Sequence, residues 1–274
     1  MGFHTGVTRV AHTSRRGALM DRRTAILETA QSQGRVTVDR LAAQFGVSAH
    51  TIRRDLNALC EEAKLRRLHG GAEFIDGSAN MPYAARAILN LEAKQAIATT
   101  VAKMVFDGAT VFISIGTTPA IVARALLAKE GLTVITNNLN AAMTLSENAT
   151  CRIILPGGEM RLPDRDFLNA AAIGLFDAYR ADFGIFGVGG IDEDGSLLDF
   201  HAPEVAAREA IRRNSRRAVL VADHTKFGRR AAAVGGRLDE QDLVVLDSRP
   251  QPPFAALLPP IAARLVIADQ ERPR

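Results

Sequence analysis

The chain has 274 residues, of which 47% are hydrophobic and 23% charged, a composition typical of globular proteins. This length allows two domains with their own cores, and the composition excludes a largely disordered chain. Residues 1–72 carry 12 Lys and Arg against six Asp and Glu, whereas the remainder carries 22 against 24. The sequence pI of about 9.4 therefore reflects a basic N-terminal part, which indicates a nucleic-acid-binding domain joined to a near-neutral one.

The first 19 residues contain Arg15 and Arg16 without an apolar core behind them, so no signal peptide is expected. We expect residues 1–19 to be a disordered extension, with Met1 or Met20 as the natural start. No apolar run reaches the length needed to cross a bilayer. The two cysteines, Cys60 and Cys151, lack metal-ligand spacing, so we expect a reduced, cytoplasmic setting, no membrane partner, no metal and no cofactor.

A helix-turn-helix is predicted in the basic part. Apolar residues recur at helical spacing from Val38 to Phe45 and end at Gly46, a residue that can turn the chain tightly at no steric cost. Ser48 is placed to cap a second helix, in which apolar residues recur at i, i+4 and i+7. This pattern predicts a DNA-binding domain over residues 20–75. The buried stripe of the second helix consists of Ile52, Leu56 and Leu59.

The outer face of the second helix is predicted to enter a major groove. Two arginines on that face can bind guanine edges or grip phosphates. The alternative for an isolated Arg-Arg pair is a solvated face of any amphipathic helix. The residues assigned to DNA on this helix are Ser48, His50, Thr51, Arg53, Arg54 and Asn57.

A wing is predicted directly after this helix. Residues 64–69 form a short basic run that reads as a strand, and Gly70-Gly71 reads as the end of a hairpin. A wing beside a recognition helix lies along the DNA backbone or the minor groove. The residues assigned to that contact are Arg66, Arg67 and His69.

The second part of the chain alternates short apolar runs with amphipathic segments. Turn-forming residues between Glu73 and Ala85 predict a linker over residues 76–90, followed by a domain over 91–270. The alternation predicts an α/β fold with a Rossmann-like parallel sheet covered on both faces. Strands are expected at 110–115, 133–136, 152–155, 183–188, 218–222, 243–246 and 265–268, and helices at 91–106, 119–127, 139–146, 170–179 and 203–214.

Ligands bind beyond the carboxyl ends of the strands in such a sheet. The residues that follow the apolar runs are rich in glycine and in hydrogen-bond donors, which suits a phosphorylated ligand. The residues assigned to ligand binding are Gly116, Thr117, Thr118, Asn137, Asn138, Gly157, Gly158, Gly189, Glu204 and Lys226.

The first of these loops offers a specific mechanism. Thr118 is expected to cap the next helix, with Pro119 at its first position, so that the amides after Gly116 face one anion. The alternative is that Gly-Thr-Thr-Pro is only a tight strand-to-helix turn.

Charged residues in the later loops admit two interpretations each. Lys226 could supply positive charge or be a solvated lysine, and Glu204 could accept ligand hydroxyls or pair with a helix dipole. Acidic residues around Gly195 resemble a calcium loop, but the final glutamate is missing and the register differs, so a turn is favoured. Those acids are Asp192, Asp194 and Asp199.

These motifs also carry a resemblance. Segment 51–56 (Thr-Ile-Arg-Arg-Asp-Leu) and segment 69–72 (His-Gly-Gly-Ala) resemble the DNA-binding signature of the DeoR family of bacterial transcriptional regulators. Further matching segments extend the resemblance from residue 20 to about residue 245. It departs at Ser114, where an acid is usual, at Asn169, where a glycine is common and a left-handed backbone is expected, and in segment 163–166. The further matching segments are 115–119, 134–140, 152–159, 182–185, 189–192, 195–198 and 223–228.

The resemblance implies a winged helix-turn-helix joined to a sugar-phosphate sensor of the ribose-phosphate isomerase type. We therefore expect a regulator, in most members a repressor, that binds a double-stranded DNA operator as a dimer or tetramer. Its effector is expected to be a phosphorylated sugar or polyol such as glycerol 3-phosphate. The alternative is a sugar-phosphate isomerase, for which Glu204 and His224 are the sole candidates for proton transfer; no catalytic residue is assigned.

Overall fold

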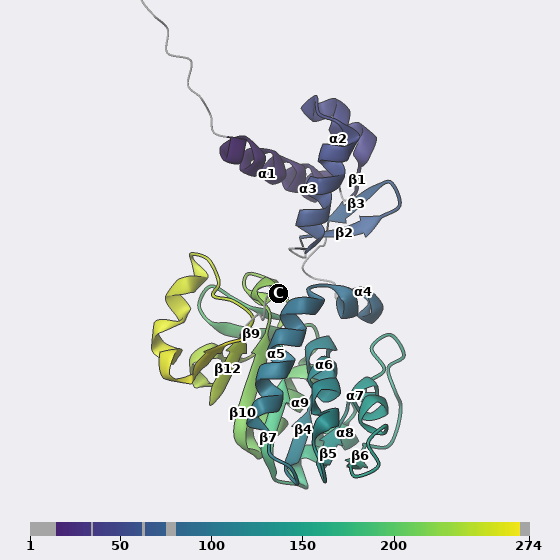
Figure 1. The fold of residues 1–274 in the computed structure, drawn as a ribbon, viewed down its shortest axis with the longest axis vertical. Helices are drawn as coiled ribbons and strands as arrows, with labels where there is room; N and C mark the ends of the chain where they lie inside the picture. The colour runs from purple at the N-terminus through teal and green to yellow at the C-terminus, as the bar shows by residue number, and fades with distance from the viewer. Residues whose placement is uncertain (1–14, 34, 62–63, 75–80, 269–274) are drawn as a thin grey trace, which may run out of the picture. The chain divides into compact units, whose positions relative to one another are not determined.

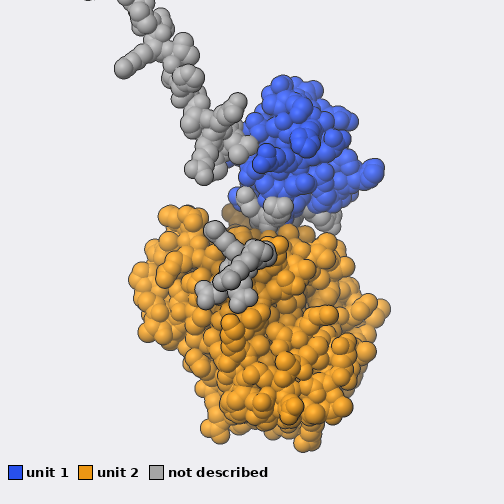
Figure 2. Space-filling view, in the orientation of Figure 1, with its two compact units in different colours: residues 1–76 blue, residues 77–274 orange. Residues whose placement is uncertain are grey.

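The computed structural model describes residues 15–33, 35–61, 64–74 and 81–268 (Figure 1). Its internal contacts divide the chain into two compact units, residues 1–76 and 77–274 (Figure 2). Within the described part, no helix combines the length and apolar character needed to cross a bilayer.

The N-terminal unit is a helix-turn-helix with a wing. A three-stranded antiparallel sheet with the order β1-β3-β2 packs beside the helices, and the β2–β3 hairpin forms the wing. Helix α1 begins inside the segment expected as an extension; residues 1–14 of that segment lie outside the described residues. The elements are α1 (Arg15–Gln33), β1 (Arg35–Thr37), α2 (Val38–Phe45), α3 (Ala49–Glu61), β2 (Leu65–Leu68) and β3 (Gly71–Phe74).

The local chemistry of the turn between α2 and α3 confirms the helix-turn-helix prediction. Gly46 ends α2 in the left-handed conformation with φ of 62° and donates its amide to Ala42 O. Ser48 Oγ accepts the Thr51 amide at 3.2 Å and so caps α3. The predicted stripe of α3 is buried, with Ile52 and Leu56 fully inaccessible.

The second unit is built on a seven-stranded, entirely parallel sheet. The strand order is β13-β12-β10-β7-β4-β5-β6, and every strand expected from the sequence belongs to it. The strands are β4 (Thr110–Ile113), β5 (Thr133–Thr136), β6 (Arg152–Ile154), β7 (Ala181–Phe186), β10 (Ser215–Ala222), β12 (Leu243–Leu246) and β13 (Leu265–Ile267).

Helices cover both faces of this sheet and bury two separate cores (Figure 1). Helices α5, α6 and α7 supply one core, and α8 and α9 contribute to the other. This arrangement confirms the expected Rossmann-like α/β fold. The helices are α5 (Leu91–Met104), α6 (Thr117–Ala125), α7 (Leu139–Leu145), α8 (Ala170–Asp177) and α9 (Ala202–Arg213), with 3-10 turns η1 (Leu126–Ala128), η2 (His224–Lys226), η3 (Leu238–Glu240), η4 (Phe254–Leu257) and η5 (Pro259–Arg264).

Two features were not predicted. Helix α4 (Tyr83–Ile88) lies within the segment expected as a linker, whose residues 76–80 are outside the described part. A small antiparallel sheet, ordered β11-β9-β8, is formed by β8 (Gly190–Ile191), β9 (Ser196–Asp199) and β11 (Ala233–Arg237).

The acids around Gly195 belong to this small sheet. Asp194 carboxylate oxygens accept the amide and hydroxyl of Ser196 at 2.8 and 2.9 Å, so the segment is a hairpin turn between β8 and β9. Asn169 differs from its expectation, because its φ is −86° and its side chain caps α8 by accepting the Ala172 amide at 2.9 Å.

Candidate functional site

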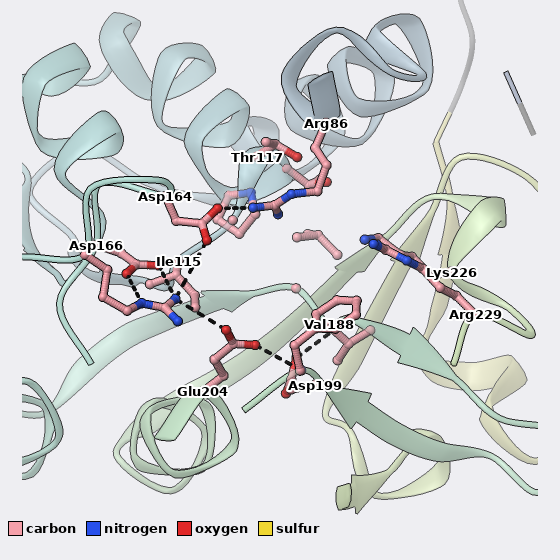
Figure 3. Close-up of a pocket in the computed structure, with 18 residues that line it drawn as sticks. Arg86, Ile115, Thr117, Asp164, Asp166, Val188, Asp199, Glu204, Lys226 and Arg229 are labelled. Atoms are coloured by element: carbon pink, nitrogen blue, oxygen red, sulfur yellow. Dashed lines mark hydrogen bonds and ion pairs between the residues drawn. The ribbon is translucent and has the colours of Figure 1, made fainter. Parts of the chain in front are cut away.

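A pocket lies at the carboxyl ends of β4, β7 and β10, where the parallel sheet was expected to bind its ligand (Figure 3). Helix α4, the β6–α8 loop and the start of α9 complete its wall. It is lined by Arg86, Ile115, Gly116, Thr117, Thr118, Pro119, Arg161, Asp164, Asp166, Gly187, Val188, Gly189, Asp199, Phe200, Glu204, Val221, Lys226 and Arg229.

The N-terminus of α6 forms one side of the pocket. Gly116 precedes the helix with φ of 106°, a conformation that favours glycine. The amides of Thr117 and Thr118 come before the first intrahelical bond, from Ala120 N to Gly116 O at 3.3 Å, so they point out of the helix end. The prediction that Thr118 caps α6 is wrong: the helix begins at Thr117, Gly116 is its cap residue, and no side chain caps it. The end remains suited to an anion.

Basic side chains form another side. Burial, and after it the positive charge of Arg229, lowers the pKa of Lys226 to about 7. Burial and the charge of Arg86 likewise lower the pKa of Arg229 to about 10. Figure 3 shows Lys226 and Arg229 together at one side of the pocket. Like charges gathered in a partly desolvated space favour the binding of an anion.

The opposite side holds carboxylates tied to arginine. Arg161 donates to both oxygens of Asp166 at 2.7 and 2.8 Å and to Glu204 Oε1 at 3.3 Å. The second Glu204 oxygen accepts the Phe200 amide at 3.2 Å. Burial, and after it the charge of Asp199, raises the pKa of Glu204. These oxygens can accept hydroxyl groups of a polyol or sugar.

Asp199 also lines the pocket and is buried. Its carboxylate accepts the Gly189 amide at 2.9 Å and the Arg208 Nε at 3.0 Å, while burial raises its pKa. These bonds hold the β7–β8 loop, and hence Gly189, at the pocket.

Six of the ten predicted ligand residues line the pocket: Gly116, Thr117, Thr118, Gly189, Glu204 and Lys226. Asn138 does not line it, but its side chain donates to Ser114 O and Gly116 O, both at 3.1 Å, and positions the α6 loop. Asn137 donates to Phe167 O at 2.9 Å. Gly157 O accepts the Asn169 side chain at 3.3 Å, and neither Gly157 nor Gly158 lines the pocket.

Several lining residues were missed by the sequence reasoning. Arg86 comes from a segment expected as linker, and Arg161, Asp164 and Asp166 come from the long β6–α8 loop. The sequence held one indication that this loop has a role of its own, because segment 163–166 departs from the family pattern. His224, the other candidate for proton transfer, bonds Asp247 at 2.6 Å and is not among the lining residues.

Most of the predicted DNA-binding residues on α3 lie on one exposed face of that helix. His50, Arg53, Arg54 and Asn57 are exposed on α3 at spacings of three and four, opposite the buried stripe. Ser48, Arg67 and His69 are also exposed, and Thr51 is half-buried. Arg66 pairs with Glu73 in the wing strands, but its side chain lies outside the described part.

A buried carboxylate joins this face to α1, which the sequence did not reveal. Asp55 is 1% exposed and accepts Arg22 Nε at 2.6 Å and Arg23 Nε at 3.3 Å. Arg22 and Arg23 line a hollow with His50, Thr51 and Arg54. The orientation of the recognition helix therefore depends on α1.

A helix-turn-helix unit joined to a sheet domain with an anion-favouring pocket defines a ligand-responsive, DNA-binding transcriptional regulator. Comparison with known proteins identifies its family. Residues 22–78 match the DeoR-like helix-turn-helix domain, and residues 89–248 match the DeoR C terminal sensor domain. The chain belongs to the DeoR family.

Two relatives are named as glycerol-3-phosphate regulon repressors. The protein of Escherichia coli (strain K12) is 45% identical over 229 residues, covering 84% of this chain and 91% of its own. The Haemophilus influenzae protein is 41% identical over 226 residues, covering 82% and 88%. Such relatives are transcriptional regulators, so this chain is a regulator and not the isomerase of the alternative hypothesis.

Solved structures are more distant. Ribose 5-phosphate isomerase A from Methanocaldococcus jannaschii is 17% identical, covers 56% of this chain and 59% of its own, and superposes with a TM-score of 0.38. A likeness this weak says nothing about function.

Proposed function

We propose that this chain represses genes of glycerol metabolism and is released from its operator by glycerol 3-phosphate or a closely related polyol or sugar phosphate. The observation that carries the proposal is the pocket, in which the α6 N-terminus and a basic pair face a wall of carboxylates. The 45% identity to a glycerol-3-phosphate regulon repressor over most of both chains supports it.

The two sides of the pocket match the two ends of such an effector. The phosphate would accept hydrogen bonds from the amides and hydroxyls of Thr117 and Thr118 and would be neutralised by Lys226 and Arg229. The polyol hydroxyls would donate to the carboxylate of Glu204. An unphosphorylated polyol would bind only to the carboxylate side of the pocket, and inorganic phosphate only to the side with the α6 N-terminus and the basic residues.

Asn137, Asn138, Gly157 and Gly158 complete the proposed sensor as residues that shape the loops around the pocket. On the other unit, Arg53, Arg54 and the wing would bind the operator. One winged domain reads few bases, so we propose a dimer or tetramer on paired half-sites, acting in the cytoplasm where the DNA lies. A change from mostly bound to mostly released requires the effector to favour the non-binding state by about 5.5 kcal/mol.

The proposal can be tested with the purified full-length chain. An operator is first selected from a random duplex pool, and fluorescence anisotropy then follows the protein on the labelled operator. We expect glycerol 3-phosphate to release it, and glycerol and inorganic phosphate to have no effect at equal concentration. A complex unaffected by glycerol 3-phosphate but released by another sugar phosphate would contradict the glycerol assignment; one unaffected by all phosphates would contradict the effector class.

A further inference from the structure

Arg86 lines the pocket from α4, a helix that precedes the first strand of the parallel sheet in the chain. Helix α4 is the first described element of the second unit and begins six residues after the start of that unit at Gly77. It also lies between the two segments matched by the family models, 22–78 and 89–248. A pocket residue is therefore carried by the element nearest, along the chain, to the DNA-binding unit.

Polar contacts hold α4 against the pocket. The Arg86 guanidinium forms an ion pair with Asp164, and its Nε donates to Met81 O at 2.8 Å. From α5, the Lys94 ammonium donates to the carbonyl oxygens of Arg86 and Leu89, the latter at 2.6 Å. Lys94 itself is 3% exposed. One ionic contact to a pocket loop and one buried lysine thus hold α4, together with its contact to α6.

Asn90, shortly after α4, contacts the loop that carries Lys226 on the basic side of the pocket. The Asn90 side chain donates to Asp223 Oδ1 and Thr225 Oγ1, both at 3.3 Å. Asp223 and Thr225 immediately precede Lys226. Arg86 of α4 therefore contacts the acidic loop, and Asn90, the cap residue of α5 that follows, contacts the lysine-bearing loop.

The ion pair with Asp164 lies beside the proposed phosphate site. Helix α4 contacts α6, and Figure 3 shows Arg86 beside Thr117, at the helix end proposed to bind phosphate. The exposed fractions of the Arg86 and Asp164 side chains are only 12% and 19%. A phosphate placed there brings negative charge next to the Asp164 carboxylate and offers the guanidinium a bidentate partner of higher charge.

We propose that Arg86 is an effector-binding residue that exchanges Asp164 for the effector phosphate and thereby moves α4. This inference rests on the proposed function, because it concerns the same pocket. The empty state has the Arg86–Asp164 pair and an α4 position that permits operator binding; the filled state has the Arg86–phosphate contact and a displaced α4. Because the coupling is a free energy shared by two sites, operator binding must weaken effector binding by the same factor.

Two variants with opposite expected effects on effector affinity separate effector binding from its coupling to operator binding. R86Q removes the phosphate ligand, so we expect the Kd for glycerol 3-phosphate, measured by calorimetry, to rise about tenfold or more. D164N removes the competing charge, so we expect tighter effector binding together with operator affinity weakened several-fold in the absence of effector. R165Q is the matched control, because Arg165 is an exposed neighbour that does not line the pocket.

The outcomes distinguish this inference from the proposed function. If the wild type neither binds nor responds to glycerol 3-phosphate, the proposed function fails and this inference with it. If the wild type responds and R86Q responds equally, only the role of Arg86 is overturned. If D164N binds its operator like the wild type, the coupling through α4 is overturned. If R86Q lowers the melting temperature, R86K provides a second test, because lysine keeps the charge but cannot donate the two parallel hydrogen bonds of a guanidinium. The Kd of R86K for glycerol 3-phosphate should lie between those of R86Q and the wild type.

Discussion

Effector binding should weaken as pH rises through neutrality, because the pocket contains a lysine that loses its proton there. Burial and the neighbouring Arg229 lower the pKa of Lys226 to about 7. For a group with a lowered pKa, the charged form is present below that value and is lost above it. The phosphate contributes no opposing change above pH 7, because its second ionisation lies near about pH 6.

The size of the effect follows from the protonated fraction. With a pKa of about 7, Lys226 is half protonated at pH 7 and only about 1% protonated at pH 9. If only the protonated form binds, the apparent Kd rises about 50-fold between these values. The nearby Lys94, whose pKa burial lowers to about 8, acts in the same direction, whereas Arg229 stays charged over most of this range because its pKa is about 10.

Calorimetry is the suitable assay, since the chain has no tryptophan to report binding. We expect the Kd of the wild type for glycerol 3-phosphate to rise at least about fivefold from pH 7 to pH 9. The K226R variant keeps its charge at pH 9 and should show a much flatter profile, while K226M should bind weakly at every pH. A wild-type Kd that is constant over this range, or an equally steep profile in K226R, would refute the assignment to Lys226.

Three further substitutions test separate parts of the molecule. Arg54→Ala should weaken operator binding by about 1–3 kcal/mol without changing the effector Kd; an unchanged gel shift would show that this face of α3 does not meet DNA. Thr117→Ala with Thr118→Ala removes the two hydroxyls beside the helix-end amides, so it should leave operator binding intact and raise the effector concentration needed for release; release at the wild-type concentration would show that these hydroxyls do not bind the phosphate. Asp55→Asn should lower the free energy of unfolding by about 1–3 kcal/mol in chemical denaturation, since Asp55 is buried with two arginine partners, and unchanged stability would mean that these ion pairs contribute little.

The parallel sheet could be predicted because its strands are buried on both faces and are therefore apolar at successive positions. In β12 (Leu243–Leu246), all four residues are buried. The small sheet gives no such signal, because β8 has two residues and β11 contains Gly235 and Gly236. Its pairing depends on long-range contacts that no local pattern records.

The side of the pocket formed by strand ends could be predicted for a related reason. Parallel strands place their carboxyl ends at one edge, so Gly116, Gly189 and Lys226 meet regardless of their sequence separation. Side chains from a long loop or a preceding helix have no such constraint. Arg161 and Arg86 reach the pocket from β6–α8 and α4, and in the sequence each is one arginine among many.

The balance of charge in the pocket explains why an anionic effector can drive a change of state. The carboxylates of Asp164, Asp166 and Glu204 have arginine partners, whereas the pKa values of Lys226 and Arg229 are lowered first by burial and then by repulsion among the gathered cations. That repulsion raises the free energy of the empty pocket, and a bound phosphate dianion relieves it. A neutral polyol would leave it unchanged. The same residues therefore provide affinity for a phosphate, and the proposed exchange of Arg86 from Asp164 to the phosphate would make that affinity differ between the two states, as any effector-driven shift requires.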